Sequence, residues 1–500
     1  MDVAVSVTRI SKDIFEIGVH AADVSYFVRP KTAVDKEARD RGLLVRLVDK
    51  TISMLPETLH KNLCSFRAGR KRLGFSVIWT MNSDGHIHET WFGKTVLKSC
   101  AQFSFAQVQS VIQGSTLSES IKLHDCTASG MEEALRSMSS LAISLRQRRL
   151  GLNKSATGQK TRLTFELNAN GFPEALSTTS HCEAQDALQE LCIMANVSVA
   201  QKITKHFPEH ALLRRQDPII DTLLKSFAPD EPNLDMHSFS KDAFEAALLG
   251  IHDVEELGLL RFLAAKSARP ALYFGAGTTD INKYFHHGHG VSLYTHFTSP
   301  VCRYAAIVVH RQLEAALKQE REWHSDKEED EKIIMHCNVR ENASRNAAEQ
   351  SSHLYLCSYL NRQNLIASHL HQTATVFCVQ EDSIDVYIHA YDLRQRIFLD
   401  DIYAEHTYDP TTGTITLTWS MEDHRFGAGD DELVLEDVEA DLPKSHLHSS
   451  TENTHDVIVA LDNVQTISRL ADIEVSMSVD MNVSPPVIVV DVVNSFFKQV

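Results

Sequence analysis

The chain has 500 residues, of which 43% are hydrophobic and 23% are charged. This is the composition of an ordinary globular protein, long enough for one large core and at least one smaller domain, and it excludes a largely disordered chain. The net charge of −17 opposes polyanion binding by the surface as a whole, because affinity for phosphate comes mainly from Lys and Arg. Any nucleic-acid site must therefore be a local cluster of basic residues.

Cysteine spacing and the N-terminus exclude two further classes of protein. The nine cysteines are scattered, without the close pairs that chelate zinc or the dense framework of a small secreted domain, which favours a reducing compartment. The first residues lack a basic segment followed by an apolar one, and no later run approaches the length of a membrane span. We expect neither export nor membrane insertion.

The first hundred residues predict a sheet. Residues 14–28 are rich in β-branched and aromatic side chains and predict a strand, a tight passage and a second strand. Leu73–Thr80 and His86–Leu97 predict a strand pair, because the Asp-Gly within Asn82–Gly85 is typical of a hairpin turn.

Helical periodicity follows. Two sets of apolar residues recur on one helical face: Met131, Leu135, Met138, Leu141 and Leu145, and then Leu188, Leu191, Ala195, Val199 and Ile203. Further helices are expected at 241–266, 299–320 and 330–368.

The last part of the chain returns to a period of two. Expected strands are Thr373–Val379, Ser383–His389, Arg396–Leu399 and Thr414–Trp419, followed by others around 456–499. They predict a small five-stranded barrel interrupted by an acidic insert at 422–453. The chain as a whole is therefore expected to be an α+β protein, with a mixed core of sheet and helices over residues 1–370 and a β-barrel over 371–500.

One tract carries the strongest functional signal. It runs from Tyr294 to Pro300 and continues through Cys302, Arg303 and Tyr304. Ser299 followed by Pro300 predicts a helix start, so that free backbone N–H groups and Arg303 would meet at one positive end. Such an end suits a phosphate group.

Together with four other motifs, this tract resembles the RNase II (RNB) family of processive 3′-to-5′ exoribonucleases over roughly residues 1–370. The other motifs are Ile17–Val24, Asp35–Ala38, Met54–Pro56 and Ala211–Arg215. Trp91–Thr95 and Cys337-Asn338 are similar to the eukaryotic cytoplasmic branch, which includes fungal pseudonucleases that bind RNA. The resemblance implies an RNB catalytic-type core followed by an OB-fold barrel.

Family catalysis rests on four aspartates at the start of the core, which hold two Mg²⁺ ions about 4 Å apart. By resemblance, Asp2 matches the third aspartate, Val3 replaces the fourth, and the first two would precede Met1. Asp2 is then a vestigial catalytic and metal-binding residue that cannot organise two ions alone. The cold-shock domains usual in the family are also missing, so the chain is expected to begin inside the core.

Two more positions depart from the family pattern. The arginine that contacts the scissile phosphate and stabilises transition-state charge is replaced by Cys302. The tyrosine that stacks near the terminal nucleotide is replaced by Arg46, which can stack or bind phosphate in a different geometry. The remaining RNA-binding positions match, and with Arg46 the expected RNA-binding set is Tyr294, Thr298, Ser299, Arg303, Arg311 and Glu349.

Some motif residues have a purely structural interpretation. His20 and Asp23 are expected to lock a turn rather than to contact RNA. Arg214-Arg215 is either a solvated surface pair or part of the core. The histidines of His286–His289 lack a Cys or acid at zinc-binding spacing and predict sequence drift rather than a metal site.

Two functional hypotheses follow. The first is a degenerate core that binds single-stranded mRNA without a cofactor, as a monomer, in cytoplasmic mRNA regulation or turnover, including RNA granules such as P-bodies. The alternative is a 3′-to-5′ exoribonuclease dependent on Mg²⁺ or Mn²⁺ whose N-terminal part is missing from this chain. A third, weaker possibility is an unstable fragment, since a lost strand before Asp2 would leave a sheet edge unpaired.

Overall fold

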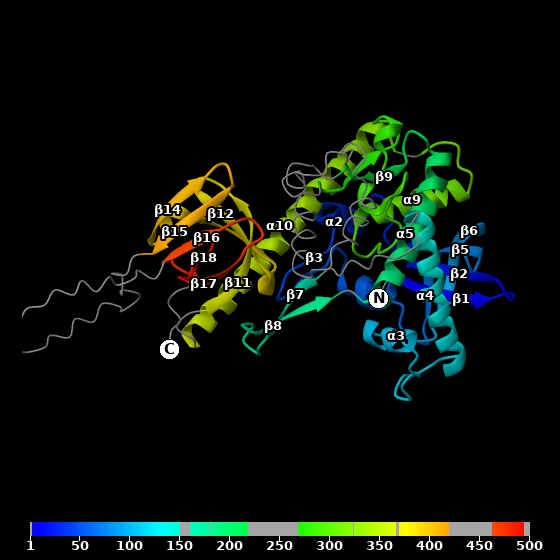
Figure 1. Cartoon of the computed structure of the whole chain (residues 1–500). Coiled ribbons are helices and arrows are strands. Elements are labelled where there is room, and N and C mark those ends of the chain that lie inside the picture. The colour runs from blue at the N-terminus through cyan, green and yellow to red at the C-terminus, as the bar shows by residue number, and fades with distance from the viewer. Residues whose placement is uncertain are drawn as a thin grey trace, which may run out of the picture. The chain divides into compact units, whose positions relative to one another are not determined.

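The computed structural model describes residues 3–150, 161–180, 182–218, 269–323, 325–366, 370–419 and 463–494. The chain forms two compact units, Met1–Tyr359 and Leu360–Val500 (Figure 1). The first is the mixed core and the second contains the barrel, so the expected α+β architecture is confirmed. The helix expected at 241–266 and the acidic insert at 422–453 lie outside the described residues.

A four-stranded antiparallel sheet organises the first unit. Its order is β1 (Val3–Arg9), β2 (Ile14–Ala22), β5 (Lys71–Asn82) and β6 (Ile87–Lys98). The expected β5–β6 hairpin is confirmed. From Phe75 onward, every second side chain of β5 is apolar and fully buried, namely Phe75, Val77, Trp79 and Met81. This period of two presents one apolar face to the helices.

Two long helices cover that face, α4 (Ala128–Leu150) and α5 (Glu183–His206), as Figure 1 shows. Helix α4 packs against β1, and α5 packs against β2 and β5. The short helix α3 (Phe105–Ile112) rests on both α4 and α5. The apolar periodicity predicted both long helices correctly, because most of the periodic apolar residues of α4 and α5 are buried in the core.

A row of polar side chains crosses all four strands. The buried His20 ring bonds Ser6 Oγ at 2.9 Å and Ser76 Oγ at 2.7 Å, and Ser76 in turn bonds Thr95 Oγ1 at 2.7 Å. Burial lowers the pKa of His20 to about 4, so the ring is neutral near pH 7. These contacts give His20 a structural role.

The second strand expected within 14–28 is absent, and a short helix, α1 (Val24–Phe27), takes its place. The physical reason is Asp23, whose carboxylate accepts hydrogen bonds from Tyr26 N–H and the Ser25 hydroxyl and so starts a helical turn. Lys94 of β6 pairs with the same carboxylate at 3.2 Å. Asp23 therefore fixes the backbone, as its position in the motif predicted.

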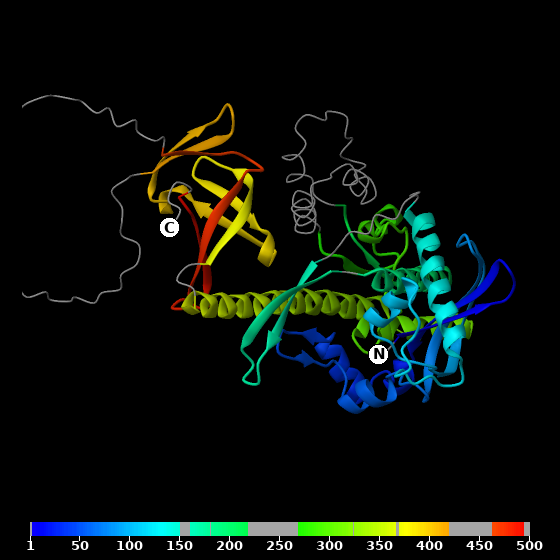
Figure 2. The same cartoon turned by 60° about the horizontal axis from the view of Figure 1, so that its bottom comes forward.

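Smaller elements complete the first unit. They are α2 (Ala33–Arg41), β3 (Val45–Arg46), β4 (Thr51–Ile52), η1 (Thr58–Leu63), β7 (Thr161–Leu167), β8 (Pro173–Ser180), β9 (Leu212–Arg215), β10 (Leu272–Gly275), η3 (Ile281–Lys283), η4 (His287–His289) and α9 (Tyr304–Leu317). The long helix α10 (Lys327–Ile366) follows, and Figure 2 shows the β7–β8 hairpin lying across it. Phe165 of the hairpin and Tyr355 of α10 have ring centroids 6.1 Å apart.

The second unit contains the barrel. Five antiparallel strands run in the order β13 (Leu393–Phe398), β12 (Ser383–Ile388), β11 (Leu370–Val379), β17 (Asp472–Asp480) and β18 (Val487–Val492). Contacts between the edge strands β13 and β18 nearly close the sheet, as an OB fold requires. A second sheet of β14 (Ala404–Asp409), β15 (Thr414–Trp419) and β16 (Val464–Ile467) accompanies it, with two short turns, η5 (His389–Tyr391) and η6 (Leu399–Asp401).

In the described part of the chain, no helix combines the length and the apolar composition of a membrane span.

Candidate RNA-binding site

The tract that begins at Tyr294 runs through the interior of the first unit beside β9. Arg214 N–H donates to the Tyr294 carbonyl at 2.7 Å, and the Thr295 hydroxyl donates to the Leu212 carbonyl at 2.6 Å. Tyr294 and Thr298 are both buried. The backbone of the tract is therefore fixed by the sheet rather than exposed as a surface loop.

Asn196 of α5 holds the middle of this tract. Its amide oxygen accepts the N–H groups of Phe297 at 2.8 Å and Thr298 at 2.9 Å. Its amide nitrogen donates to the Tyr294 hydroxyl at 3.0 Å and to Thr298 Oγ1 at 3.3 Å. A single side chain that is only 2% exposed thus satisfies four polar groups of the tract.

The expected helix start at Ser299-Pro300 is wrong. Helix α9 begins at Tyr304 with Arg303 as its N-cap residue. Ser299 has a φ of +60°, a left-handed conformation, and its carbonyl accepts Cys302 N–H at 3.0 Å. Pro300 is therefore the second residue of a β-turn that precedes the helix, a position its fixed φ also suits.

This turn places Cys302 and Arg303 against the segment that precedes β3. Leu43 and Arg303 form an antiparallel bridge, flanked by hydrogen bonds from Leu44 N–H to the Cys302 carbonyl and from Tyr304 N–H to the Gly42 carbonyl, at 2.9 and 2.8 Å. Two tracts more than two hundred residues apart in the sequence thus meet. Arg46 follows in β3 and is exposed.

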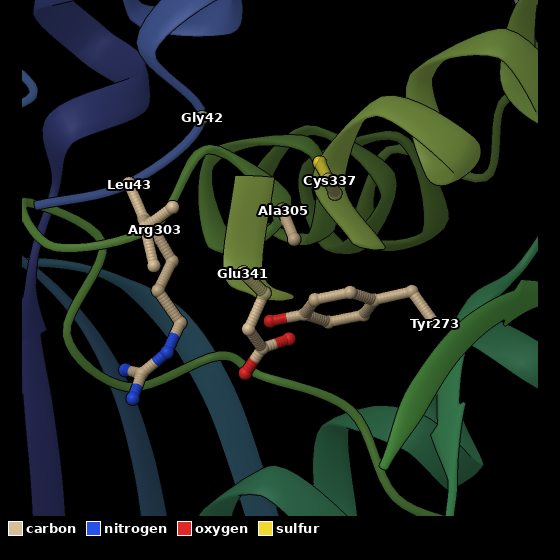
Figure 3. A pocket seen from close by; sticks show the side chains of 7 residues that line it. All are labelled: Gly42, Leu43, Tyr273, Arg303, Ala305, Cys337 and Glu341. Atoms are coloured by element: carbon tan, nitrogen blue, oxygen red, sulfur yellow. The ribbon is translucent and has the colours of Figure 1, made fainter. Parts of the chain in front are cut away.

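Arg303 lies at the edge of a small cavity between these segments (Figure 3). The cavity is lined by Gly42, Leu43, Tyr273, Arg303, Ala305, Cys337 and Glu341. Its volume is about 10 Å³, which is about the space that one water molecule needs. Figure 3 shows the Glu341 carboxylate and the Tyr273 hydroxyl pointing toward one another, while Arg303 extends to one side. No hydrogen bond or ion pair joins the Arg303 guanidinium to the described residues.

The first arginine of the Arg214-Arg215 pair belongs to the core rather than to a solvated surface. The Arg214 guanidinium forms two hydrogen bonds of 2.6 and 2.7 Å to the Glu341 carboxylate and lies 4.8 Å from the centre of the Tyr273 ring. Only 11% of the Arg214 side chain is exposed. Asn338 holds the neighbouring strand β10, because its side chain bonds both the N–H and the carbonyl of Tyr273 at 2.8 and 2.9 Å.

Three titratable rings at the tract, those of Tyr273, Tyr294 and His296, are held in their neutral forms. Burial raises the pKa of Tyr273 and of Tyr294. Burial, and then the positive charges of Arg303 and Arg214, lowers the pKa of His296 well below its ordinary value. The Tyr273 hydroxyl and His296 Nδ1 are 2.5 Å apart. These groups form a fixed polar network rather than one that exchanges protons near pH 7.

Histidines of the His286–His289 segment pack around Tyr294. The rings of His286 and His289 stack at 4.4 Å, and each lies within 5 Å of the Tyr294 ring, at 4.9 and 4.7 Å. Among the described residues, no three His, Cys, Asp or Glu side chains form a group with metal-binding geometry.

Arg311 is already paired inside the protein. Its guanidinium donates to Asp35 Oδ1 at 2.6 Å and to the Val28 carbonyl at 2.8 Å, and it lies 3.5 Å from the Tyr304 hydroxyl. Both charged side chains are largely buried, at 14% and 9% exposure. The contacts explain why these residue types occur in the Asp35–Ala38 and Arg311 motifs. An RNA contact by Arg311 stays a prediction.

The remaining predicted site residues do not line the cavity beside Arg303. Glu349 is exposed on α10. Val3 is the first residue of β1 and pairs with Ala21. Asp2 lies outside the described residues.

Three residues of the site were missed at the level of sequence, namely Asn196, Tyr273 and Glu341. Only Asn196 carries a recognisable signal, because it is a polar residue next to the apolar positions of α5. Tyr273 and Glu341 are brought to the site by long-range packing of β10 and α10, which no local pattern reveals.

Two protein-family models match the chain. The RNB domain model matches residues 1–319, and the model described as DIS3-like exonuclease 2 C terminal matches residues 369–453. The chain belongs to the RNB family. DIS3-like exonuclease 2 of Schizosaccharomyces pombe is 33% identical, covering 84% of this chain and 46% of that protein. The chain spans about half the length of the curated relatives it matches, which is 46%, 52% and 42% of three of them.

Solved structures show the same RNB fold. Yeast Ssd1, described as a pseudonuclease, superposes with a TM-score of 0.80 at 22% identity and covers 100% of this chain and 66% of its own. RNase R of Mycoplasma genitalium, in complex with ribose-methylated single-stranded RNA, gives a TM-score of 0.75 at 17% identity, covering 98% of this chain and 68% of its own. At these identities the likeness establishes the fold alone.

Proposed function

We propose that this chain binds single-stranded RNA through its RNB core and does not hydrolyse it. The observation that carries the proposal is position 302, where a thiol follows the tract Tyr294–Pro300 (the pocket tract), which Asn196 holds by hydrogen bonds. We expect the protein to act as a monomer on mRNA in the cytoplasm, including RNA granules such as P-bodies.

Two arginines support RNA binding. Arg303 projects from the turn between the pocket tract and α9 without a hydrogen bond or ion pair to the described residues, and Arg46 is exposed on β3 in the adjoining segment. The bridge between Leu43 and Arg303 holds these segments together. Two cations on paired backbone segments suit successive phosphates of one strand.

Two substitutions relative to the family pattern oppose hydrolysis. A cysteine at 302 cannot supply the guanidinium that stabilises charge on the scissile phosphate, and removing one such donor typically costs a hundred- to a thousand-fold in rate. Val3 cannot ligate a metal ion through its side chain, whereas the matching family residue is an aspartate. RNA binding by these arginines needs neither Mg²⁺ nor Mn²⁺.

The test is RNA affinity measured by fluorescence anisotropy with a labelled single strand over a range of salt concentrations. We expect Arg303→Ala and Arg46→Ala each to weaken binding about 3- to 10-fold and to reduce the slope of log K against log salt by about 0.7, one phosphate contact each. Arg321→Ala removes the same charge from an exposed position beyond the other end of α9 and should change neither quantity.

Unchanged affinity and salt slope in both Arg303→Ala and Arg46→Ala would show that RNA does not bind at this site. Equal weakening by Arg321→Ala would show that only the overall charge matters. Circular dichroism of each variant confirms that the fold is retained.

A further inference from the structure

Two cysteines that are distant in the sequence lie together at the edge of the first unit. Cys100 follows β6, and Cys126 precedes α4. The two segments are tied by an ion pair of 2.6 Å between Lys98 Nζ and Asp125 Oδ2 and by a hydrogen bond of 2.9 Å from His124 N–H to the Cys100 carbonyl. Asp125 has a φ of +57°, a turn that brings the chain back toward Cys100.

The Cys100 side chain lies close enough to the Cys126 thiol to influence its ionisation. Both residues are half-buried and neither is in a disulfide. Burial, and then the neighbouring Cys100, raises the pKa of the Cys126 thiol, which keeps it protonated at neutral pH. A disulfide needs two cysteines on adjacent backbone segments, and the ion pair and the backbone bond supply that arrangement.

We propose that Cys100 and Cys126 form a reversible disulfide when the protein is exposed to hydrogen peroxide. Peroxide first oxidises one thiol to a sulfenic acid and is itself reduced to water. The second sulfur then attacks the sulfenic sulfur, the S–O bond breaks, and a second water leaves. The net reaction is two thiols and one peroxide to one disulfide and two waters.

The crosslink would close residues 101–125 into a covalent loop that contains α3. Because α3 packs against α4 and α5, the loop joins one edge of the sheet to the helices that cover it. Loop closure stabilises mainly by restricting the unfolded chain. We therefore expect oxidation to raise the melting temperature of the protein by about 3 to 6 °C.

The experiment treats the reduced, folded full chain with a small excess of hydrogen peroxide, blocks remaining thiols, and maps peptides by mass spectrometry without reduction. We expect a crosslinked peptide pair containing Cys100 and Cys126 as the main disulfide, and its loss after dithiothreitol. The matched variants are Cys100→Ser and Cys126→Ser, which should abolish the crosslink and the melting shift. Cys302→Ser, at another half-buried cysteine, should leave both intact.

Oxidation in denaturing urea distinguishes a pair formed by the fold from random pairing, since the Cys100–Cys126 product should dominate only in the folded protein. Over-oxidation of the two residues to sulfinic acid without a crosslink would overturn the proposal. So would a dominant pairing of either cysteine with a third one, or an unchanged melting temperature after quantitative crosslinking.

Discussion

At the scale of single residues, the geometry of the pocket tract depends on Asn196. Four buried polar groups of the tract find their partner in this one amide, and α5 holds the amide in place through its apolar contacts with the sheet. A buried donor or acceptor left without a partner costs about 1 to 3 kcal/mol. The tract is thus maintained by a residue that is not expected to touch RNA.

We expect Asn196→Ala to lower the free energy of unfolding by about 2 to 4 kcal/mol and to weaken RNA binding, because Phe297 N–H, Thr298 N–H and the Tyr294 hydroxyl lose their partner. Urea denaturation followed by circular dichroism measures the first effect. Ser292→Ala, at an exposed position just before the tract, is the control and should stay within about 0.5 kcal/mol of the parent. A similar decrease in the free energy of unfolding in both variants would show that Asn196 has no special role in holding the tract.

Buried histidines give a second prediction at this scale. Burial lowers the pKa of both His20 and His310 to about 4 in the folded protein, whereas an unfolded histidine titrates near 6.5. Between these values the unfolded chain binds more protons, so the free energy of unfolding is highest above pH 6.5 and falls as the pH drops toward 4. The total loss should be a few kcal/mol.

His310→Phe tests this assignment. The ring packs between Phe75 and Phe297, and Nε2 bonds the Phe297 carbonyl at 2.9 Å, so the variant should be less stable at pH 7.5. Between pH 6.5 and 4.5 the free energy of unfolding should also depend less steeply on pH than in the parent, by up to about 1.4 kcal/mol per pH unit, because one titrating group is gone. A pH slope equal to that of the parent would mean that His310 does not titrate in this way.

At the scale of elements, the segment that carries Arg46 is positioned by the end of α2. Gly42 closes that helix with a φ of +73°, and its carbonyl accepts Tyr304 N–H from the start of α9. A Cβ at this position would come within 2.8 Å of Arg340 Cβ and Cγ. The glycine is required by both the turn and the close approach of α10.

Gly42→Ala is expected to cost about 2 kcal/mol or more and to weaken RNA binding by displacing the Leu43–Arg303 bridge. Gly171→Ala is the matched control, because Gly171 has a φ of +82° but open space around its Cβ direction, and it should cost only about 1 kcal/mol. If urea denaturation gave the same decrease in the free energy of unfolding for both variants, the close approach of Arg340 would not contribute to the cost of Gly42→Ala.

Local patterns predicted most elements and failed where a side chain redirects the backbone. The strands β5, β6, β11 and β12 and the helices α4 and α5 follow directly from apolar periodicity, because that periodicity is what their packing uses. Asp23 turned an expected strand into a helical turn, and Ser299-Pro300 formed a β-turn instead of a helix start. In both cases the competing structures share the same residue preferences.

At the scale of the whole molecule, the motifs were enough to predict the family. The contacts that form the site could be seen only in the folded structure. Tyr294, Thr298 and Arg303 are close in the sequence, but no local pattern predicted that their tract meets the segment that carries Arg46. The sequence could not show that Arg214 and Arg311 are engaged by Glu341 and Asp35, since those pairs join residues far apart in the chain. Of these four arginines, Arg214 and Arg311 are paired with carboxylates. Arg303 and Arg46 make no ion pair with the described residues.

The overall charge makes the location of these two cations decisive. At a net charge of −17 the molecule as a whole repels RNA. Binding therefore depends on a local site whose cations are not already neutralised by acidic partners. This is why substitution of a few arginines is expected to have a large effect.

The central claim, binding without hydrolysis, is tested most directly by incubating the purified full chain with a 5′-labelled single-stranded RNA in the presence of Mg²⁺ or Mn²⁺. Complex formation and RNA length are followed in the same samples. We predict that the RNA becomes protein-bound and keeps its full length in both metals. Processive shortening from the 3′ end, by an activity that co-elutes with the protein through successive purification steps, would contradict the account and establish an active exoribonuclease.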